Sequence, residues 1–248
     1  MEKYYNAPCF IINLERRPDR LQTSCFRVNQ VGYKNIYRFE AVDGQDENQL
    51  KKEWANLNNP KINEKDELFL INKGRQGCAL THIKLWKYII DNNIEFATVF
   101  EDDIIFHKEW FTRSEEYMKS TPTNFDILYL GCYLDYMIQA YIYTAPVYCT
   151  HAYIITLEGA KKFLNLILNN PDGIYTIDVM IINLMQNYLC FDTMAKKEPP
   201  FIWYIWNGDI FPYENYPGIT LGRISDEFYK RKHSGIVFQD DECGSDIV

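Results

Sequence analysis

The chain has 248 residues, with 34 acidic and 26 basic side chains and a formal net charge of −8. This acidic balance argues against nucleic acid as the main ligand. A hydrophobic content of 47% with 16% aromatic residues excludes intrinsic disorder for most of the chain. No apolar stretch approaches the roughly 18 residues of a membrane-spanning helix, so no transmembrane segment is predicted.

The cysteines and the N-terminal residues indicate in which cellular compartment the protein is expected. The seven cysteines form no CxxC pair and no zinc-knuckle spacing, which favours free thiols in a reducing environment. The first residues lack the apolar stretch of about 7 to 15 residues that a signal peptide needs. We therefore expect a cytoplasmic protein.

The first elements along the chain predict a β-α-β unit. Residues 9–12 are a short apolar run typical of a strand, and Pro18 then begins a helix that ends at Gly32. Residues 36–42 form the second strand. The predicted apolar face of the helix comprises Leu21, Cys25 and Val28.

The next region, residues 45–76, is polar and charged, and it is expected to be an insertion or a mobile loop around one short helix. From Gly77 an apolar helical face continues to about residue 91, and a buried strand follows at 97–100. A second apolar run at 104–106 lies beyond three consecutive acids. This order of elements favours an α/β protein.

Further strands are predicted at 126–130 and at 141–156, the latter as a hairpin around residues 145–146. Helices are predicted at 157–168 and 176–188. Alternating strands and helices predict a Rossmann-like, mostly parallel sheet with helices on both faces. We expect one domain over residues 1–248, ending in an acidic tail at 235–248.

The three acids are the clearest chemical signal. Glu101, Asp102 and Asp103 lie between apolar flanks, at the carboxyl end of a predicted buried strand where parallel-sheet proteins bind ligands. In an extended segment Glu101 and Asp103 share a face, and such hard oxygen ligands suit Mg²⁺ or Mn²⁺ with a diphosphate partner. The alternative is an acid-rich surface turn or helix start.

Six segments appear in an order that resembles glycosyltransferase family 25, which includes bacterial lipooligosaccharide and collagen galactosyltransferases. They are INLERRPDRL, EAVDG, GCALTHIKLWKYII, VFEDDIIF, YCTHAYIITLEGAKKFL and SDI. The resemblance implies a GT-A type fold, a UDP-sugar donor and a divalent metal, usually Mn²⁺. Residues 45–76 carry no recognisable family motif, and residues 199–223 are not aligned with the family.

The resemblance also implies site residues on the donor side. Glu101, Asp102 and Asp103 match the family's acidic motif, with Asp103 the first choice as metal ligand and Glu101 the second. The loop containing Asn13, Arg17 and Arg20 resembles the donor-side loop, where arginine could pair with phosphate. Asp43 follows the second strand, where it could bind ribose hydroxyls. Solvated helix-start arginines and a simple turn aspartate are the alternatives.

Other positions carried over from the resemblance lie further along the chain. Thr81 and His82 occupy the GCALTH segment and could reach the donor, although a helix histidine is often a structural hydrogen bonder. His151 resembles a position near the sugar, but a buried strand histidine would look the same. The C-terminal positions that resemble the family are Gln239, Ser245 and Asp246, and a disordered tail is their alternative.

Asp178 is predicted to be the catalytic base. It resembles an acidic residue of the family, and an inverting transfer needs one carboxylate beside the acceptor hydroxyl, separate from the metal ligands. A first-turn aspartate that favours the helix dipole is the alternative, and Asp102 is the second candidate base. The prediction is a metal-dependent inverting transferase that moves galactose or glucose from a UDP-sugar to a hydroxyl of a glycan or glycosylated protein. An inactive UDP-sugar-binding scaffold and a metal-dependent phosphohydrolase are the rival functions.

Overall fold

The computed structural model describes residues 1–134, 142–143, 147–189, 199–206, 232–235 and 237–239. The strands are β1 (Pro8–Asn13), β2 (Asn35–Glu40), β3 (Phe96–Glu101), β4 (Ile104–Phe106), β5 (Ile127–Leu134), β6 (Ile142–Tyr143), β7 (Tyr148–Thr156), β8 (Trp203–Trp206), β9 (Lys232–Gly235) and β10 (Val237–Gln239). The helices are α1 (Glu2–Tyr5), α2 (Pro18–Gln30), α3 (Glu47–Asn56), α4 (Glu67–Ile71), α5 (Lys73–Asp91), α6 (Trp110–Ser120), α7 (Leu157–Leu168) and α8 (Ile177–Leu189).

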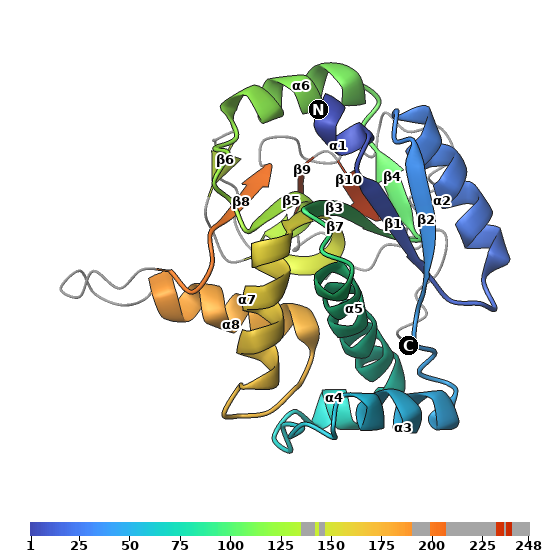
Figure 1. The fold of residues 1–248 in the computed structure, drawn as a ribbon, viewed down its shortest axis with the longest axis vertical. Helices are drawn as coiled ribbons and strands as arrows, with labels where there is room; N and C mark the ends of the chain where they lie inside the picture. The colour runs from blue at the N-terminus through green and yellow to red at the C-terminus, as the bar shows by residue number, and fades with distance from the viewer. Residues whose placement is uncertain (135–141, 144–146, 190–198, 207–231, 236, 240–248) are drawn as a thin grey trace.

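A twisted eight-stranded sheet forms the centre, in the order β2-β1-β3-β7-β5-β8-β6, with β9 paired to β5 (Figure 1). The strands β1, β2, β3, β5 and β8 point one way, and β6, β7 and β9 point the other. The predicted α/β class with a mostly parallel sheet is therefore confirmed. A separate ribbon pairs β10 with β4.

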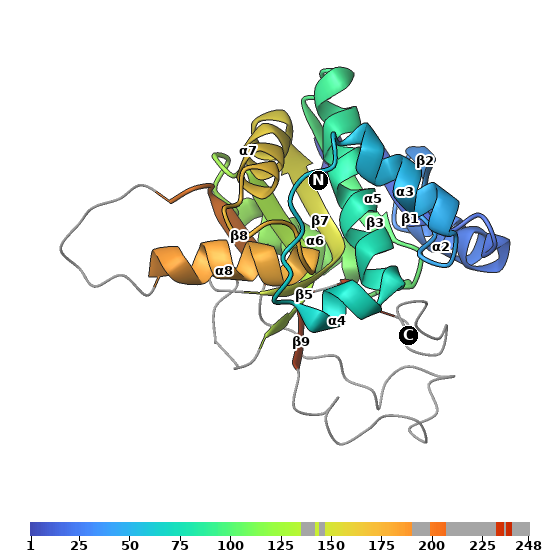
Figure 2. The ribbon, with the colours of Figure 1, turned by 90° about the horizontal axis from the view of Figure 1, so that it is seen from below.

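Helices cover both faces of this sheet, as predicted. On one face α5, α7 and α8 pack over a large apolar core that includes the buried Trp86, Phe163 and Met180. On the other face α2 and α6 contribute Val28 and Trp110 to a second core. Figure 2 shows α3, α4 and α5 grouped together, with α7 and α8 beside them. Because both faces of the sheet are covered, the sequences of the central strands are continuously apolar and do not alternate between apolar and polar residues.

Several sequence-based expectations need correction. The predicted hairpin at 141–156 is wrong, because β6 pairs with β8 while β7 lies between β3 and β5. The region 45–76, expected to hold one short helix, contains α3, α4 and the first turn of α5. Within the expected tail, residues 237–239 form β10, while residues 240–248 lie outside the described part of the chain.

The helix at Pro18 is confirmed, but its most buried face differs from the predicted one. The fully buried positions are Arg20, Ser24 and Val28, whereas Leu21 and Cys25 are only partly buried. A buried arginine needs a charged or polar partner, and that partner belongs to the site described below. Across the described residues, no helix combines the length and the apolar character needed to cross a membrane.

Candidate functional site

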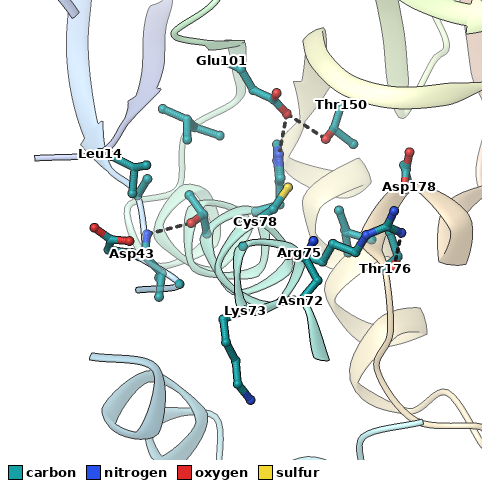
Figure 3. A pocket seen from close by; sticks show the side chains of 18 of the residues that line it. Leu14, Asp43, Asn72, Lys73, Arg75, Cys78, Glu101, Thr150, Thr176 and Asp178 are labelled. Carbon is teal, nitrogen blue, oxygen red and sulfur yellow. Dashed lines mark hydrogen bonds and ion pairs between the residues drawn. The ribbon is translucent and has the colours of Figure 1, made fainter. Parts of the chain in front are cut away.

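A cavity of about 990 Å³ opens at the edge of the sheet where β1, β2 and β3 end (Figure 3). The start of β7 and the first turns of α5 and α8 complete its wall. The predicted site residues that line it are Arg20, Asp43, Thr81, His82, Glu101, Asp102, Asp103 and Asp178. The structure thus brings these predicted residues together at one edge of the sheet.

Two glycines bring the wall elements into backbone contact. A Cβ on Gly44 would lie 2.2 Å from the carbonyl oxygen of Lys73, and one on Gly77 would lie 2.4 Å from that of Val42. The Thr81 hydroxyl joins the same two elements, because it accepts from the Val42 N–H at 2.8 Å and donates to the Gly77 carbonyl at 2.7 Å. Thr81 therefore fixes the loop after β2 against α5.

At this loop Asp43 lies on the cavity wall. Its Oδ2 accepts from the Nε–H of Arg16 at 2.8 Å, and its Oδ1 accepts from the backbone N–H of Gln45 at 2.9 Å. These contacts hold the carboxylate in a tight turn at the end of the second strand, the position predicted for it. A ligand hydroxyl would approach Asp43 beside Arg16.

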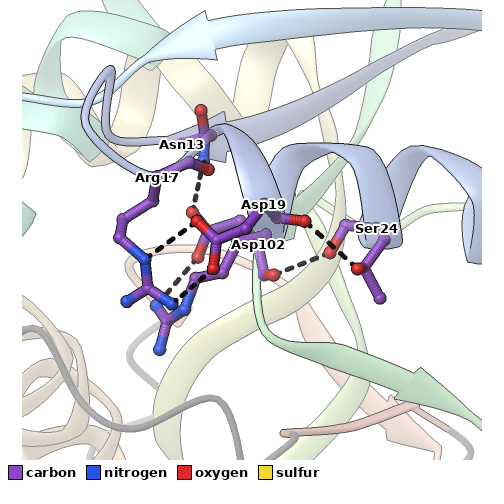
Figure 4. Close-up of polar contacts among 7 residues, drawn as sticks. Asn13, Arg17, Asp19, Ser24 and Asp102 are labelled. Atoms are coloured by element: carbon purple, nitrogen blue, oxygen red, sulfur yellow. Dashed lines mark hydrogen bonds and ion pairs between the residues drawn. The ribbon is translucent and has the colours of Figure 1, made fainter.

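Asp102 is the centre of a hydrogen-bonded group, which we call the Asp102 network: Asn13, Arg20, Ser24 and Asp102 (Figure 4). Asn13 donates to Oδ2 at 2.6 Å, and Arg20 donates to Oδ1 at 3.1 Å. Ser24 donates to the Asp102 carbonyl at 2.7 Å. Burial raises the pKa of Asp102, while Asn13 and Arg20 act against that rise. The network fastens α2 to the segment after β3.

Glu101 lies at the end of a chain of buried hydrogen bonds, the Glu101 relay: Trp86, Tyr153, His82, Glu101 and Thr150. The indole N–H can only donate, here to the Tyr153 hydroxyl at 3.1 Å. With the metal-free carboxylate as acceptor, the hydroxyl donates to Nδ1 of His82 at 2.9 Å and the His82 Nε2–H faces Glu101 Oε1 at 3.4 Å. This tautomer is assigned from the network.

The relay also sets the charge of Glu101. Burial works against ionisation, but His82, His151 and Thr150 outweigh it and lower the pKa of the carboxyl below its usual value. Thr150 donates to the same oxygen at 3.0 Å (Figure 3). Glu101 is therefore an anion that is held in position at the cavity.

Asp103 has the opposite character. Within the described part of the chain, its buried Oδ1 has no hydrogen-bond partner. Burial first, and then the charges of Glu101 and Asp102, raise its pKa well above the usual value. A cation beside Asp103 would offset both the cost of burying its charge and the repulsion from Glu101 and Asp102. Mg²⁺ and Mn²⁺ prefer hard carboxylate oxygens such as these. The residues present thus fit the divalent metal that the family resemblance implies.

Asp178 enters the cavity from the first turn of α8, on the other side from Asp43 (Figure 3). Its Oδ2 accepts from the backbone N–H of Cys149 at 3.2 Å, and its Oδ1 accepts from that of Val179 at 2.8 Å. Cys149 has a φ of 72°, a left-handed conformation that is costly for a residue other than glycine. The bend in β7 thereby aims an N–H at the carboxylate.

The sequence missed two basic residues of the cavity wall. Helix α5 begins at Lys73, four residues before its predicted start, and so adds Lys73 and Arg75 to the cavity wall. Arg75 Nη1 donates to the Thr176 hydroxyl at 3.4 Å. The signal that could have located this helix start is Asn72, whose side chain caps the helix by accepting from the Arg75 N–H at 3.1 Å.

Some predicted residues lie away from the cavity wall. Asn13 belongs to the Asp102 network, and Arg17 pairs with Asp19 at 3.0 Å on the surface. His151 is fully buried, its Nε2 lies 3.1 Å from the Val237 carbonyl, and burial lowers its pKa. The backbone of Gln239 pairs with Ile104. Ser245 and Asp246 are outside the described residues.

Sequence comparison identifies the family of the chain. A model of glycosyltransferase family 25 (LPS biosynthesis protein) matches residues 6–145, more than half of the chain. The chain belongs to glycosyltransferase family 25. The match includes the Asp102 network and the acids after β3, and it ends before Asp178.

Named relatives extend the comparison. A procollagen lysyl hydroxylase and glycosyltransferase of Acanthamoeba polyphaga mimivirus is 32% identical over an alignment of 180 residues that covers 63% of this chain and 19% of the relative. Procollagen galactosyltransferase 1-A of Xenopus laevis is 28% identical over an alignment of 172 residues that covers 63% of this chain and 28% of the relative. The probable inactive glycosyltransferase 25 family member 3 of Bos taurus is 28% identical over 170 residues, with 62% and 28% covered. The chain thus spans less than a third of these relatives.

Proposed function

We propose that this protein is a metal-dependent, inverting glycosyltransferase that moves a hexose, galactose or glucose, from a UDP-sugar to a hydroxyl of a glycan or glycosylated protein. The observation that carries the proposal is the division of carboxylates around one cavity. Glu101 ends β3 and Asp103 follows it, and Asp178 reaches the same cavity from a separate element. Inverting transfer needs this separation of metal ligands from base.

The metal side would be formed by Asp103 and Glu101. A bound Mn²⁺ or Mg²⁺ would neutralise the charge that develops on the leaving diphosphate. Without a cation these two carboxylates would repel a diphosphate, so binding of the donor should depend on the metal. Asp43, which follows β2, and Arg16, in the loop after β1, would bind the nucleoside part of the donor.

The acceptor side would be formed around Asp178. Both its oxygens accept hydrogen bonds from backbone N–H groups, which fix the position of the carboxylate. Neither donor is an acidic side chain that could protonate it. A carboxylate held this way can accept the proton of an acceptor hydroxyl as that oxygen attacks the sugar. Arg75 lies at this side of the cavity and favours an acceptor or donor group with negative charge (Figure 3).

A second candidate is a catalytically inactive protein that binds UDP-sugars as a scaffold. The name of the relative from Bos taurus, a probable inactive family member, supports keeping it. The two candidates differ in turnover: the scaffold would bind UDP without transferring or hydrolysing any sugar. The presence of Glu101, Asp103 and Asp178 around one cavity favours the enzyme.

The deciding experiment measures UDP release and product formation with UDP-galactose, UDP-glucose and their N-acetyl forms. Mn²⁺ should support turnover, EDTA should abolish it, and restored Mn²⁺ should recover it. The anomeric configuration of the product, read by NMR, tests inversion. Full transfer in the presence of chelator would contradict the metal assignment, and preferred use of a GDP- or CMP-sugar would contradict the donor assignment.

A further inference from the structure

A thiol lies beside the proposed catalytic metal ligands and has no role in the proposed transfer. Cys78 is on α5, one turn before His82, so the two side chains share a face of the helix. Both line the cavity with Glu101. Thr150, which donates to Glu101 at 3.0 Å, lines the cavity with them.

These three side chains converge closely enough to share an ion. A sulfur of Cys78, a ring nitrogen of His82 and a carboxylate oxygen of Glu101 all lie within 4.8 Å of one another. In a tetrahedral zinc site, nitrogen and oxygen ligands are about 3.4 Å apart, given bond lengths of about 2.0 to 2.2 Å. The observed separation of His82 Nε2 and Glu101 Oε1 is 3.4 Å.

We propose that Cys78, His82 and Glu101 form a binding site for a thiophilic divalent cation such as Zn²⁺, with its fourth position facing the cavity. Thiolate and imidazole ligands select zinc over the hard cations that carboxylates prefer. The site differs from the Asp103 side in chemistry but shares Glu101 with it. Zn²⁺ in this site and a hard cation bound to Glu101 would therefore exclude one another.

The surroundings favour a cation there. Burial and the charges of Glu101, Asp178 and Asp103 raise the pKa of the Cys78 thiol. The same negative field stabilises a metal ion, and a coordinating thiol loses its proton to solvent when the metal binds. His82 also has the outer partner that ligating histidines use: the Tyr153 hydroxyl at Nδ1 can turn to accept a ring proton.

Cobalt is a direct probe, because Co²⁺ bound to a thiolate gives a sulfur-to-metal charge-transfer absorption. Co²⁺ added to the metal-free full chain should produce this absorption, and Zn²⁺ should displace it. Cys78→Ser should abolish the absorption and weaken Zn²⁺ binding by at least about 10-fold in calorimetry. Cys149→Ser, which alters the other cavity thiol, should keep the absorption.

Two further measurements keep the test independent of folding and of sugar transfer. In the unmodified protein, Zn²⁺ should protect Cys78 from alkylation but not the partly exposed Cys25, as read by peptide mass spectrometry. Asp103→Asn should retain the cobalt absorption even if it abolishes transfer. The proposal fails if no charge-transfer absorption forms, if it survives in Cys78→Ser, or if Cys78 alkylates equally with and without Zn²⁺.

Discussion

The Asp102 network and the cavity carboxylates are neighbours in the chain but differ in how their charges are satisfied. Both oxygens of Asp102 accept from buried protein donors. Asp103, the next residue, keeps a buried oxygen without such a donor among the described residues. A carboxylate whose oxygens both accept hydrogen bonds from the protein stabilises the fold. A carboxylate at a cavity with an oxygen that still lacks a donor is suited to bind a ligand. The comparison separates structural acids from candidate reactive ones within one triplet.

If the cavity carboxylates carry out the reaction, the largest effect on activity is expected at Asp178. Asp178→Asn should lower kcat by about 10²- to 10⁴-fold, since a general base contributes that much, while UDP and metal affinity change little. Steady-state kinetics with calorimetry of UDP and Mn²⁺ measure both. The exposed Asp172 provides the matched control, and Asp172→Asn should leave kcat unchanged. Retention of more than about half of kcat by Asp178→Asn would remove the base assignment.

The next largest effect is on stability, at the Asp102 network. Asp102→Ala should lower the free energy of unfolding by about 3–5 kcal/mol, because it removes a carboxylate that balances the buried charge of Arg20. Urea denaturation measures this. The double variant Arg20→Met with Asp102→Leu should recover much of the loss, since it removes both buried charges. A loss below about 1 kcal/mol for Asp102→Ala would show that the network does not hold the fold.

The fold was largely predictable because its signals are local. The helix at 157–168 is observed with those bounds, and the strand at 97–100 lies within β3. The strand pairing of 141–156 was not predictable, since β6 joins β8, some sixty residues further along the chain. Periodicity identifies a strand but does not name its partner, which depends on long-range packing.

The site was predictable where a motif marks a strand end and less so elsewhere. Glu101, Asp103 and Asp178 were predicted and lie around one cavity. Arg20, which was expected to contact phosphate or solvent, lines the cavity and is also buried against Asp102, eighty-two positions away in sequence. Sequence spacing does not reveal such a partner, because burying a charge is favourable only once the fold supplies its counter-charge.

A smaller effect, on metal binding, is expected at Asp103. Asp103→Asn should weaken Mn²⁺ binding by about 10- to 100-fold in calorimetry, because an amide replaces a charged ligand oxygen. The metal-free variant should be no less stable than the unmodified protein, since ionising Asp103 is already unfavourable in the fold. Clear destabilisation of the metal-free variant would place Asp103 with the structural acids instead.

The smallest effect is expected at Glu53, a paired carboxylate remote from the cavity wall. Glu53 accepts from Lys84 at 2.8 Å and from Asn56 at 3.1 Å, and so links α3 to α5. Glu53→Gln should cost only about 0.2–1 kcal/mol at pH 7, because a partly hydrated pair contributes little, and kcat should not change.

The pH dependence of this small cost tests its origin. Burial acts to raise the pKa of Glu53, but the bonds from Lys84 and Asn56 outweigh it and lower the value below the usual 4.5. A lowered pKa means that the ion pair stabilises the fold above the unfolded-state pKa, and that this contribution is lost as pH falls through the folded-state pKa. The stability difference between the unmodified protein and Glu53→Gln should therefore shrink below about pH 4.5, in urea titrations from pH 7 downward. A difference that stays constant over this range would attribute the cost to packing rather than to charge.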